Sequence, residues 1–299
     1  MANIYFCLTL MILFFISSAF AQESYCFDDG FLYTVKEEQS SFISGKLKKE
    51  RKKINESKRK YVWQKRGKYQ LPKYEKLIYN VLWNFVPAGD AVLELKGFNN
   101  IDSRKAHHIY LYFSTKSFFD SFYALKGTGE SWFDDESKSS LKFRSNIYQG
   151  SQTKYEQLDF YPIEKTYLLN DNGILQKGNT KKYEEDVLTA LYYIRIIPLK
   201  IGGKYALDVH SGNLSWSLTV KVLRKEKIKI NLGEFNCFVI EPVIDKDLDL
   251  INSTYKMIMW LTDDKKRIPI CFKAETPVGS INAVLESVCA NRAKELGAK

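Results

Sequence analysis

The stretch "KLIYNVLWNFVPAGDAVLELKG", residues 76–97, decides the fold. Its first half alternates between apolar and other residues. This alternation places one set of side chains on a single face of a strand: Leu77, Tyr79, Val81, Trp83 and Phe85. "VPAGDA" carries turn residues, and the return strand directs Ala91, Leu93 and Leu95 inward. Two alternating strands joined by a turn predict an antiparallel hairpin with one buried face.

The same alternation recurs in two series of short stretches. The first series is "HHIYLYFS", "SLKFRSNIY", "TKYEQLDFY" and "TYLL". The second is "KYALDVH", "NLSWSLTVKVLRKEKIKI", "FNCFVIEP", "TYKMIMWLT", "RIPICFKAE" and "SINAVLES". A helix around 184–197, with Asp186 as N-cap, is predicted between them, and Ser114–Leu125 can hold a helical turn. We therefore predict a mainly all-β fold: a large antiparallel curled sheet, an open barrel or a sandwich.

Four blocks along the chain resemble a known family. They are "YNVLWNFVPAGDAVLEL", "DVLTALYYIRIIPLKIGGKY", "KVLRKEKIKINLGEFNCFVIEP" and "WLTDDKKRIPICFKAETPVGSINAVL". Their order and spacing resemble domain-of-unknown-function family 3108, a set of exported bacterial proteins, over about residues 73–286. The resemblance implies an exported, mainly β-sheet domain and supplies no catalytic residues.

Positive charge is concentrated in one segment of the 299-residue chain, whose net charge is +10. Lys46–Lys76 holds 14 basic and 3 acidic residues, and the remainder holds 31 basic and 32 acidic residues. The apolar residues of 45–72 follow no helical stripe, so we expect a solvated helix or a disordered linker. The segment is interpreted either as a contact for an anionic envelope surface or as a spacer without a partner.

The first 21 residues have the features of a secretory signal peptide. An apolar run from Ile4 to Ile16 precedes Ala19-Phe20-Ala21, the small-x-small pattern of a cleavage site, although the preceding region carries no Lys or Arg. The alternative is an uncleaved anchor helix. We therefore expect a periplasmic or cell-envelope location in a bacterium, no nucleic-acid partner, and no transmembrane helix after cleavage.

The predicted organisation follows from these boundaries. A signal peptide at 1–21 precedes a leader at 22–72, which contains the basic flexible segment 45–72. The β-domain spans 73–288, and a short tail spans 289–299.

Export leaves four cysteines, and none of them forms a CxxC motif. If residues 235–243, 254–262 and 267–275 are consecutive strands, Cys237 and Cys271 lie roughly 10 Å apart at about 4.8 Å per strand. A disulfide requires Cα atoms within about 7 Å, so these two are predicted not to pair. Cys26 with Cys289 is the remaining candidate disulfide, and free thiols are the alternative.

No catalytic or metal-binding constellation is recognisable, and no cofactor is expected. His107 and His108 are adjacent, so a strand points them to opposite faces. The acidic clusters at 134–136, 184–186 and 263–264 fall at predicted turns or at a helix start, where Asp bonds local backbone. No GxSxG motif or phosphate loop is present.

Arg195 and the aromatic residues are the candidate ligand contacts. Arg195 lies on an otherwise apolar helix and requires a carboxylate or carbonyl partner; it either joins helix to sheet or binds an anionic head group. The region 107–161 is rich in aromatic residues, which form either core or the lining of an apolar cavity. The aromatic candidates for that lining are Tyr110, Tyr112, Phe118, Phe119 and Trp132.

The sequence is compatible with three functions. The first is a non-enzymatic envelope protein that binds a lipid or another apolar or amphipathic ligand within the curled sheet. The second is a structural or protein-interaction module of the envelope. The third is a hydrolase of envelope polymers, which requires carboxylates that converge across a cleft.

Overall fold

The computed structural model describes residues 67–181, 183–244, 256–276 and 279–290 of the chain. The predicted signal peptide, Cys26 and the basic segment up to residue 66 lie outside these residues. So does the tail from residue 291 onwards. No helix within the described ranges is long and apolar enough to cross a bilayer.

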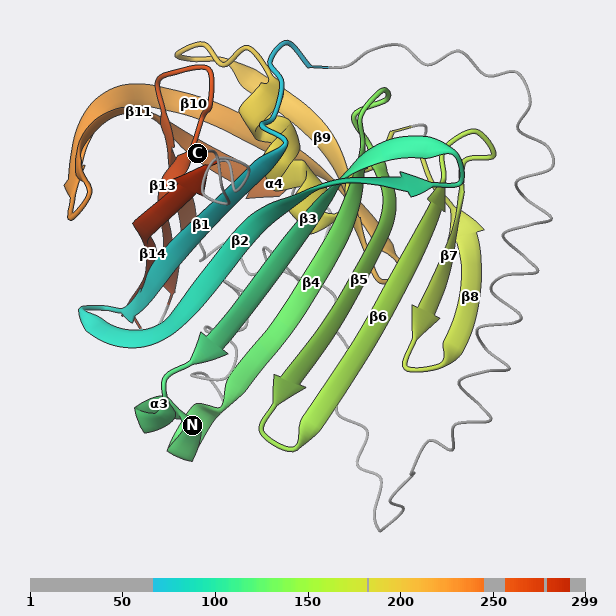
Figure 1. The fold of residues 1–299 in the computed structure, drawn as a ribbon, viewed down its shortest axis with the longest axis horizontal. Helices are drawn as coiled ribbons and strands as arrows, with labels where there is room; N and C mark the ends of the chain where they lie inside the picture. The colour runs from blue at the N-terminus through green and yellow to red at the C-terminus, as the bar shows by residue number, and fades with distance from the viewer. Residues whose placement is uncertain (1–66, 182, 245–255, 277–278, 291–299) are drawn as a thin grey trace, which may run out of the picture.

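A single antiparallel sheet of fourteen strands contains most of the described residues (Figure 1). The first series consists of β1 Tyr74–Trp83, β2 Val86–Ile101, β3 Arg104–Thr115, β4 Leu125–Asp134, β5 Ser140–Gln149, β6 Gln152–Tyr161, β7 Thr166–Asp171 and β8 Ile174–Asn179. The second consists of β9 Lys204–Ser211, β10 Leu214–Ile230, β11 Gly233–Ile244, β12 Lys256–Thr262, β13 Pro269–Thr276 and β14 Gly279–Ala290. The predicted fold class is confirmed.

The two series meet at the centre of the sheet. Its strand order is β8-β7-β6-β5-β4-β3-β2-β1-β14-β13-β12-β11-β10-β9, so β8 and β9 are the edges and the sheet is not closed. β1 pairs with β14, with Leu77 opposite Val288 and Val81 opposite Ala283. The first strand and the last strand of the domain therefore form the seam between its halves.

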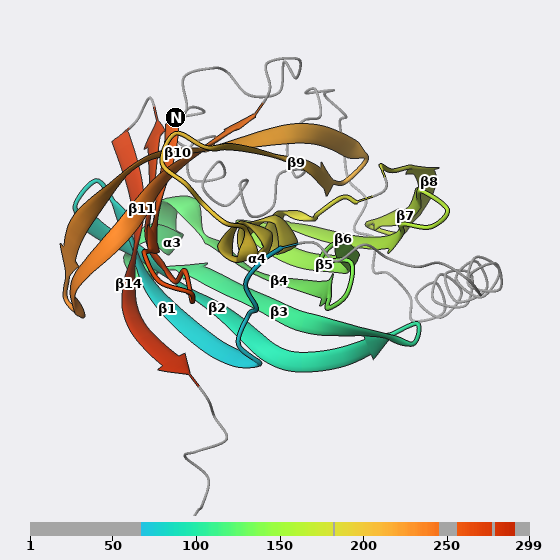
Figure 2. The same ribbon diagram turned by 90° about the horizontal axis from the view of Figure 1, so that it is seen from above.

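Helix α4 (Val187–Ile196) lies inside the curl of the sheet, between the first series and β9 (Figure 2). Asp186 caps it by accepting hydrogen bonds from the backbone nitrogens of Leu188 and Thr189, as predicted. The helix ends at Ile196 because Ile197, which precedes a proline, is extended.

The segment before α4 is extended rather than helical, so the helix is shorter than the predicted 184–197. The Ser140 nitrogen donates to the Glu184 carbonyl, and the Glu185 nitrogen donates to the Asp208 carbonyl. The segment thus links β5 to edge strand β9. These backbone bonds outweigh the helical pattern of the sequence.

The first hairpin reverses earlier than its sequence predicts. The turn is Asn84-Phe85, and β2 already begins at Val86, so the predicted turn at "VPAGDA" is wrong. Asn84 adopts a left-handed conformation with φ 54° and is bonded to Ser280 of β14. Consequently Phe85, expected on the buried face, is 94% exposed.

The sequence pattern does not indicate strand β4, because its two glycines resemble turn residues. A Cβ at Gly127 would lie 2.7 Å from the Phe113 ring and 2.7 Å from the Asn146 carbonyl oxygen. A Cβ at Gly129 would lie 3.2 Å from Leu188 of α4. The glycines therefore let Phe113 and α4 approach the inner face of β4 closely.

Candidate functional site

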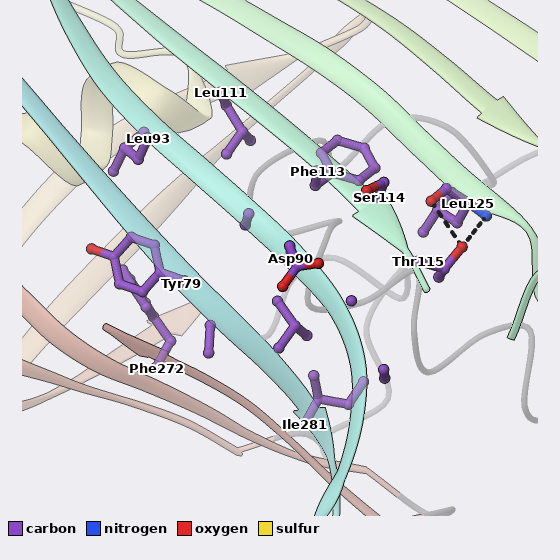
Figure 3. A pocket seen from close by; sticks show the side chains of 15 residues that line it. Tyr79, Asp90, Leu93, Leu111, Phe113, Ser114, Thr115, Leu125, Phe272 and Ile281 are labelled. Carbon is purple, nitrogen blue, oxygen red and sulfur yellow. Dashed lines mark hydrogen bonds between the residues drawn. The ribbon is translucent and has the colours of Figure 1, made fainter. Parts of the chain in front are cut away.

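An apolar pocket, partly open to solvent, lies where β1 and β3 end (Figure 3). We call this the pocket end of the sheet, and the opposite end, where β1 and β3 begin, the α4 end. Both sides of the central seam contribute lining residues: Tyr79, Val81, Ala88, Gly89, Asp90, Ala91, Leu93, Leu111, Phe113, Ser114, Thr115, Leu125, Phe272, Ile281 and Ala283.

Strand alternation and register build the pocket wall. Ala91 of β2 lies opposite Tyr79 of β1 and opposite Phe113 of β3. Leu93 lies opposite Leu111 in the same way. A Cβ on Gly89 would meet the Ser114 carbonyl oxygen at 2.6 Å, so this position requires glycine. Inward-facing residues on neighbouring strands thus form a continuous apolar surface.

The hydroxyls of Tyr79 and Thr115, at the pocket border, already have partners. The Tyr79 hydroxyl donates to the Pro269 carbonyl at 2.9 Å, and burial raises the pKa of this phenol well above its usual value. The Thr115 hydroxyl donates to Asp120 Oδ1 at 2.7 Å and accepts from the Leu125 nitrogen at 3.0 Å. These bonds favour a hydrocarbon occupant over a polar one.

Asp90 belongs to the outer face of the sheet. It alternates with the inward Ala91, its side chain is 49% exposed, and it lies 3.8 Å from the Lys116 ammonium. It therefore supplies no buried charge to the pocket.

None of the five aromatic candidates lines the pocket. Tyr110 and Tyr112 lie on the outer face of β3, where the Lys96 ammonium is 3.3 Å from the Tyr110 ring centroid and Tyr112 is 39% exposed. Trp132 stacks on His108, with 4.9 Å between ring centroids, and donates to Asn99 Oδ1 at 3.3 Å. The strand pattern separates these rings from the concave face.

Phe118 and Phe119 lie beside the pocket, on helix α3 (Ser117–Tyr123). This helix falls within the predicted helical segment Ser114–Leu125, and it connects the lining residues Thr115 and Leu125. Phe119 is buried and packs edge-on against Trp83 at 6.2 Å, whereas Phe118 is 71% exposed.

Arg195 joins α4 to the sheet. Its Nη1 and Nη2 donate to the Glu75 carboxylate at 2.6 and 2.8 Å, and Nη2 also donates to the Lys266 carbonyl at 3.1 Å. Burial lowers the pKa of the guanidinium, but Glu75 more than offsets this, and the pKa is raised above its usual value. Of its two predicted roles, the geometry supports the structural ion pair, because protein groups fill both donor positions.

Asp186 anchors the start of α4 in a buried polar network. Its carboxylate accepts from the hydroxyls of Ser131 at 2.5 Å, Ser140 at 2.7 Å and Thr189 at 2.8 Å. Burial raises the pKa of Asp186, and these hydrogen bonds partly oppose the rise. Asp186 therefore positions the helix against β4 and β5.

The remaining acidic clusters are also engaged locally. Asp134 accepts a bidentate pair from Arg104, at 3.1 and 2.6 Å. Asp264 accepts from the Lys266 and Arg267 nitrogens at 2.9 Å each. In each cluster the geometry suits a turn or an ion pair.

The three histidines lie in separate environments. His107 packs on Phe98, His108 lies 3.0 Å from Glu130, and His210 Nδ1 lies 2.9 Å from Glu184. Burial lowers the pKa of His107 to about 4, and Asp135 partly opposes this shift. Within the described ranges, no group of three His, Cys, Asp or Glu side chains could hold a metal ion.

The cysteines on β11 and β13 are buried free thiols, and β12 lies between their strands. Burial raises the pKa of Cys237 to about 11 and that of Cys271 to about 12, which makes both poor nucleophiles at neutral pH. Cys289 is exposed on β14, and its predicted pairing with Cys26 lies outside the described residues.

Sequence reasoning predicted the inward faces of β1 and β2 but did not identify them as a ligand site. The missed lining residues include Leu111, Phe113, Phe272 and Ile281. Alternation places each of them on an inner face, yet only the β1–β14 pairing brings the two strand series together. A signal was available in the small residues Ala88, Gly89, Ala91 and Ala283, which leave space between larger neighbours.

The chain belongs to the family described as "Protein of unknown function (DUF3108)", whose model matches residues 78–286. A β-barrel-like protein of the domain of unknown function DUF1849 from Brucella abortus has a similar structure. Its TM-score is 0.50 at 8% identity, with 75% of this chain and 100% of that chain covered. A protein with YmcC-like fold from Bacteroides fragilis covers the same shares, with a TM-score of 0.32 at 10% identity. No curated protein sequence matches the chain. The Brucella protein supports the open barrel-like fold alone.

Proposed function

We propose that this chain is an exported, non-enzymatic protein of the bacterial cell envelope that binds the hydrocarbon part of an apolar or amphipathic ligand. The observation that carries the proposal is the pocket at the end of the curled sheet. It is concave and partly open to solvent, and apolar side chains from both strand series dominate its lining, as is typical of small-molecule sites.

The energetics suit an alkyl chain. Each methylene group moved from water into the pocket contributes about 0.8 kcal/mol, so ten contribute about 8 kcal/mol. Association costs at least about 4 kcal/mol of this gain. Ten buried methylene groups therefore leave at most about 4 kcal/mol, which corresponds to a Kd of about 1 mM, and each further methylene group tightens binding about fourfold. The polar head remains at the mouth.

Export and the lack of enzymatic activity rest on other observations. The apolar N-terminal run with its Ala19-Phe20-Ala21 pattern supports export to the envelope. The acidic clusters are engaged in caps and ion pairs, which supports a binding role over hydrolysis.

Two adjacent residues of β2 provide a matched test. Ala91→Trp fills the pocket, whereas Val92→Trp adds the same ring at a position that alternates to the outer face. Native mass spectrometry should detect a copurifying amphiphile. After delipidation, a fluorescent fatty acid should bind wild type and Val92→Trp alike, and at least tenfold more weakly to Ala91→Trp. A wild type that neither copurifies with an amphiphile nor binds the probe would exclude the proposal.

Edge strand β8 supports a second candidate function, an interaction module. β8 is the last strand on its side of the sheet, and four of its six residues are exposed. Such an edge can pair with a strand of a partner protein. Ile174→Lys with Gln176→Lys should then abolish recovery of a partner from envelope extract, while Ile201→Lys, on another exposed turn, should not.

A further inference from the structure

The β1–β2 turn exposes apolar residues beside the pocket mouth. Phe85 is 94% exposed and Val86 is 49% exposed. The sequence from Leu77 to Gly89 contains no charged residue, so the tip of this hairpin is uncharged. Exposed aromatic residues at an uncharged tip are typical of a surface that contacts an apolar partner.

The tip is held in place rather than left to fold back on the core. The Asn84 nitrogen donates to the Ser280 carbonyl at 2.6 Å, and the Ser280 nitrogen donates to Asn84 Oδ1 at 2.9 Å. These bonds tie the turn to β14, and Phe85 is kept in solvent.

Helix α3 adds a second exposed ring to the same mouth. The ring centroids of Phe118 and Phe119 are 5.5 Å apart, and Phe119 contacts Trp83 at the end of β1. The Lys116 nitrogen donates to the carbonyl of Ala88, a lining residue, at 2.9 Å. The hairpin tip and α3 therefore both border the pocket, and Phe85 and Phe118 are the exposed rings of this border.

We infer that this border, defined by Phe85, Val86 and Phe118, docks on a lipid surface. The inference rests on the proposed function, because an amphiphile resides in a lipid phase and can enter a pocket that opens against that phase. Rings that project from a turn and a short helix can insert between head groups, where aromatic side chains are favoured. Because the hairpin tip carries no charge, apolar insertion rather than ion pairing drives docking.

Flotation with phosphatidylcholine vesicles tests the inference. Wild type should bind these neutral vesicles with little dependence on salt. Phe85→Ser and Phe118→Ser should each weaken binding roughly tenfold, and the double variant roughly a hundredfold. Ile201→Ser is the matched control, because Ile201 is 60% exposed but lies beyond α4, and it should bind like wild type.

Several results would overturn the inference. If wild type does not bind neutral vesicles or anionic ones, no element docks on lipid. If it binds only anionic vesicles and is released by salt, docking belongs to the basic segment Lys46–Lys76. Equal vesicle binding by the double variant and wild type would show that neither ring takes part in docking. Self-association of wild type that the double variant abolishes would identify the border as a contact between copies of the chain.

Binding of the soluble fatty-acid probe without vesicles separates this inference from the proposed function. The double variant should keep the probe affinity of wild type, which Ala91→Trp should lose. If the double variant loses probe binding as well, its rings belong to the pocket and the docking inference fails. If wild type does not bind the probe, the proposed function fails, whatever the vesicles show.

Discussion

At the α4 end of the curled sheet, charged and polar side chains are buried together; at the pocket end, aromatic side chains face solvent. Arg195 is 1% exposed at the first end, and Phe85 is 94% exposed at the second. Arg195, Glu75 and Asp186 are buried at the α4 end with hydrogen-bonding partners, which removes most of the cost of burial. At the pocket end, the exposed Phe85 and Phe118 rings instead leave apolar surface in solvent. The α4 end therefore contributes to stability, whereas the pocket end leaves apolar surface exposed.

Breaking the Arg195–Glu75 ion pair should cause the largest loss of stability, and this loss arises at the α4 end. Arg195→Met leaves the Glu75 carboxylate buried without its cation, and we expect a loss of about 3–5 kcal/mol in the free energy of unfolding. Urea denaturation measures the loss.

The control for this prediction removes both charges. Glu75→Leu with Arg195→Met should recover most of the lost stability, because no unpaired charge remains buried. A double variant as unstable as Arg195→Met would show that shape, not charge, decides stability at this site.

Acidification should also weaken the α4 end, through His107. Because its pKa is about 4 in the folded protein and 6.5 ordinarily, the unfolded chain takes up the proton first as the pH falls. Stability should therefore be complete above about pH 6.5, and up to about 3 kcal/mol should be lost as the pH falls to 4. Denaturation of wild type and His107→Gln from pH 7 to pH 4 measures the difference. Parallel pH profiles would contradict the assignment to His107.

A pair of leucine truncations sharpens the comparison, and the difference expected between them, about 2 kcal/mol, is the smallest predicted effect. Leu188 of α4 is fully buried against Gly129, whereas Leu93 borders the pocket. Leu188→Ala should cost about 4 kcal/mol and Leu93→Ala about 2 kcal/mol, because Leu93 already lacks neighbours on one side. Urea midpoints at equal m-values measure both. Equal losses would mean that the pocket end is packed as tightly as the core.

Much of the fold could be predicted from local pattern. Alternation identified the inward Tyr79 and Leu93, and Asp186 marked the start of α4. A buried guanidinium requires a carboxylate or carbonyl partner. The sequence therefore predicted the kind of partner that Arg195 has, but it did not identify Glu75. These features depend on periodicity, capping and charge, which a short window of sequence contains.

The pocket and the exposed ring could not be predicted in the same way. The pocket depends on β1–β14 pairing, which joins residues at opposite ends of the domain. Phe85 continues the alternation of β1, and only the left-handed Asn84 and its bonds to Ser280 end the strand before it. Trp132 looks like a cavity residue by composition, yet its position in β4 places it on the outer face beside His108.

The seam between β1 and β14 also sets the order in which the protein can fold. Each strand series is a meander of neighbours along the chain, so both can form from local contacts as soon as they are synthesised. The pairing of Glu75 with Ala290 must close a loop of roughly 200 residues, which makes it the slowest contact to form. Both walls of the pocket meet only at this pairing. The pocket should therefore be absent from a nascent chain until β14 has emerged, and a ligand of the proposed kind should stabilise the completed seam.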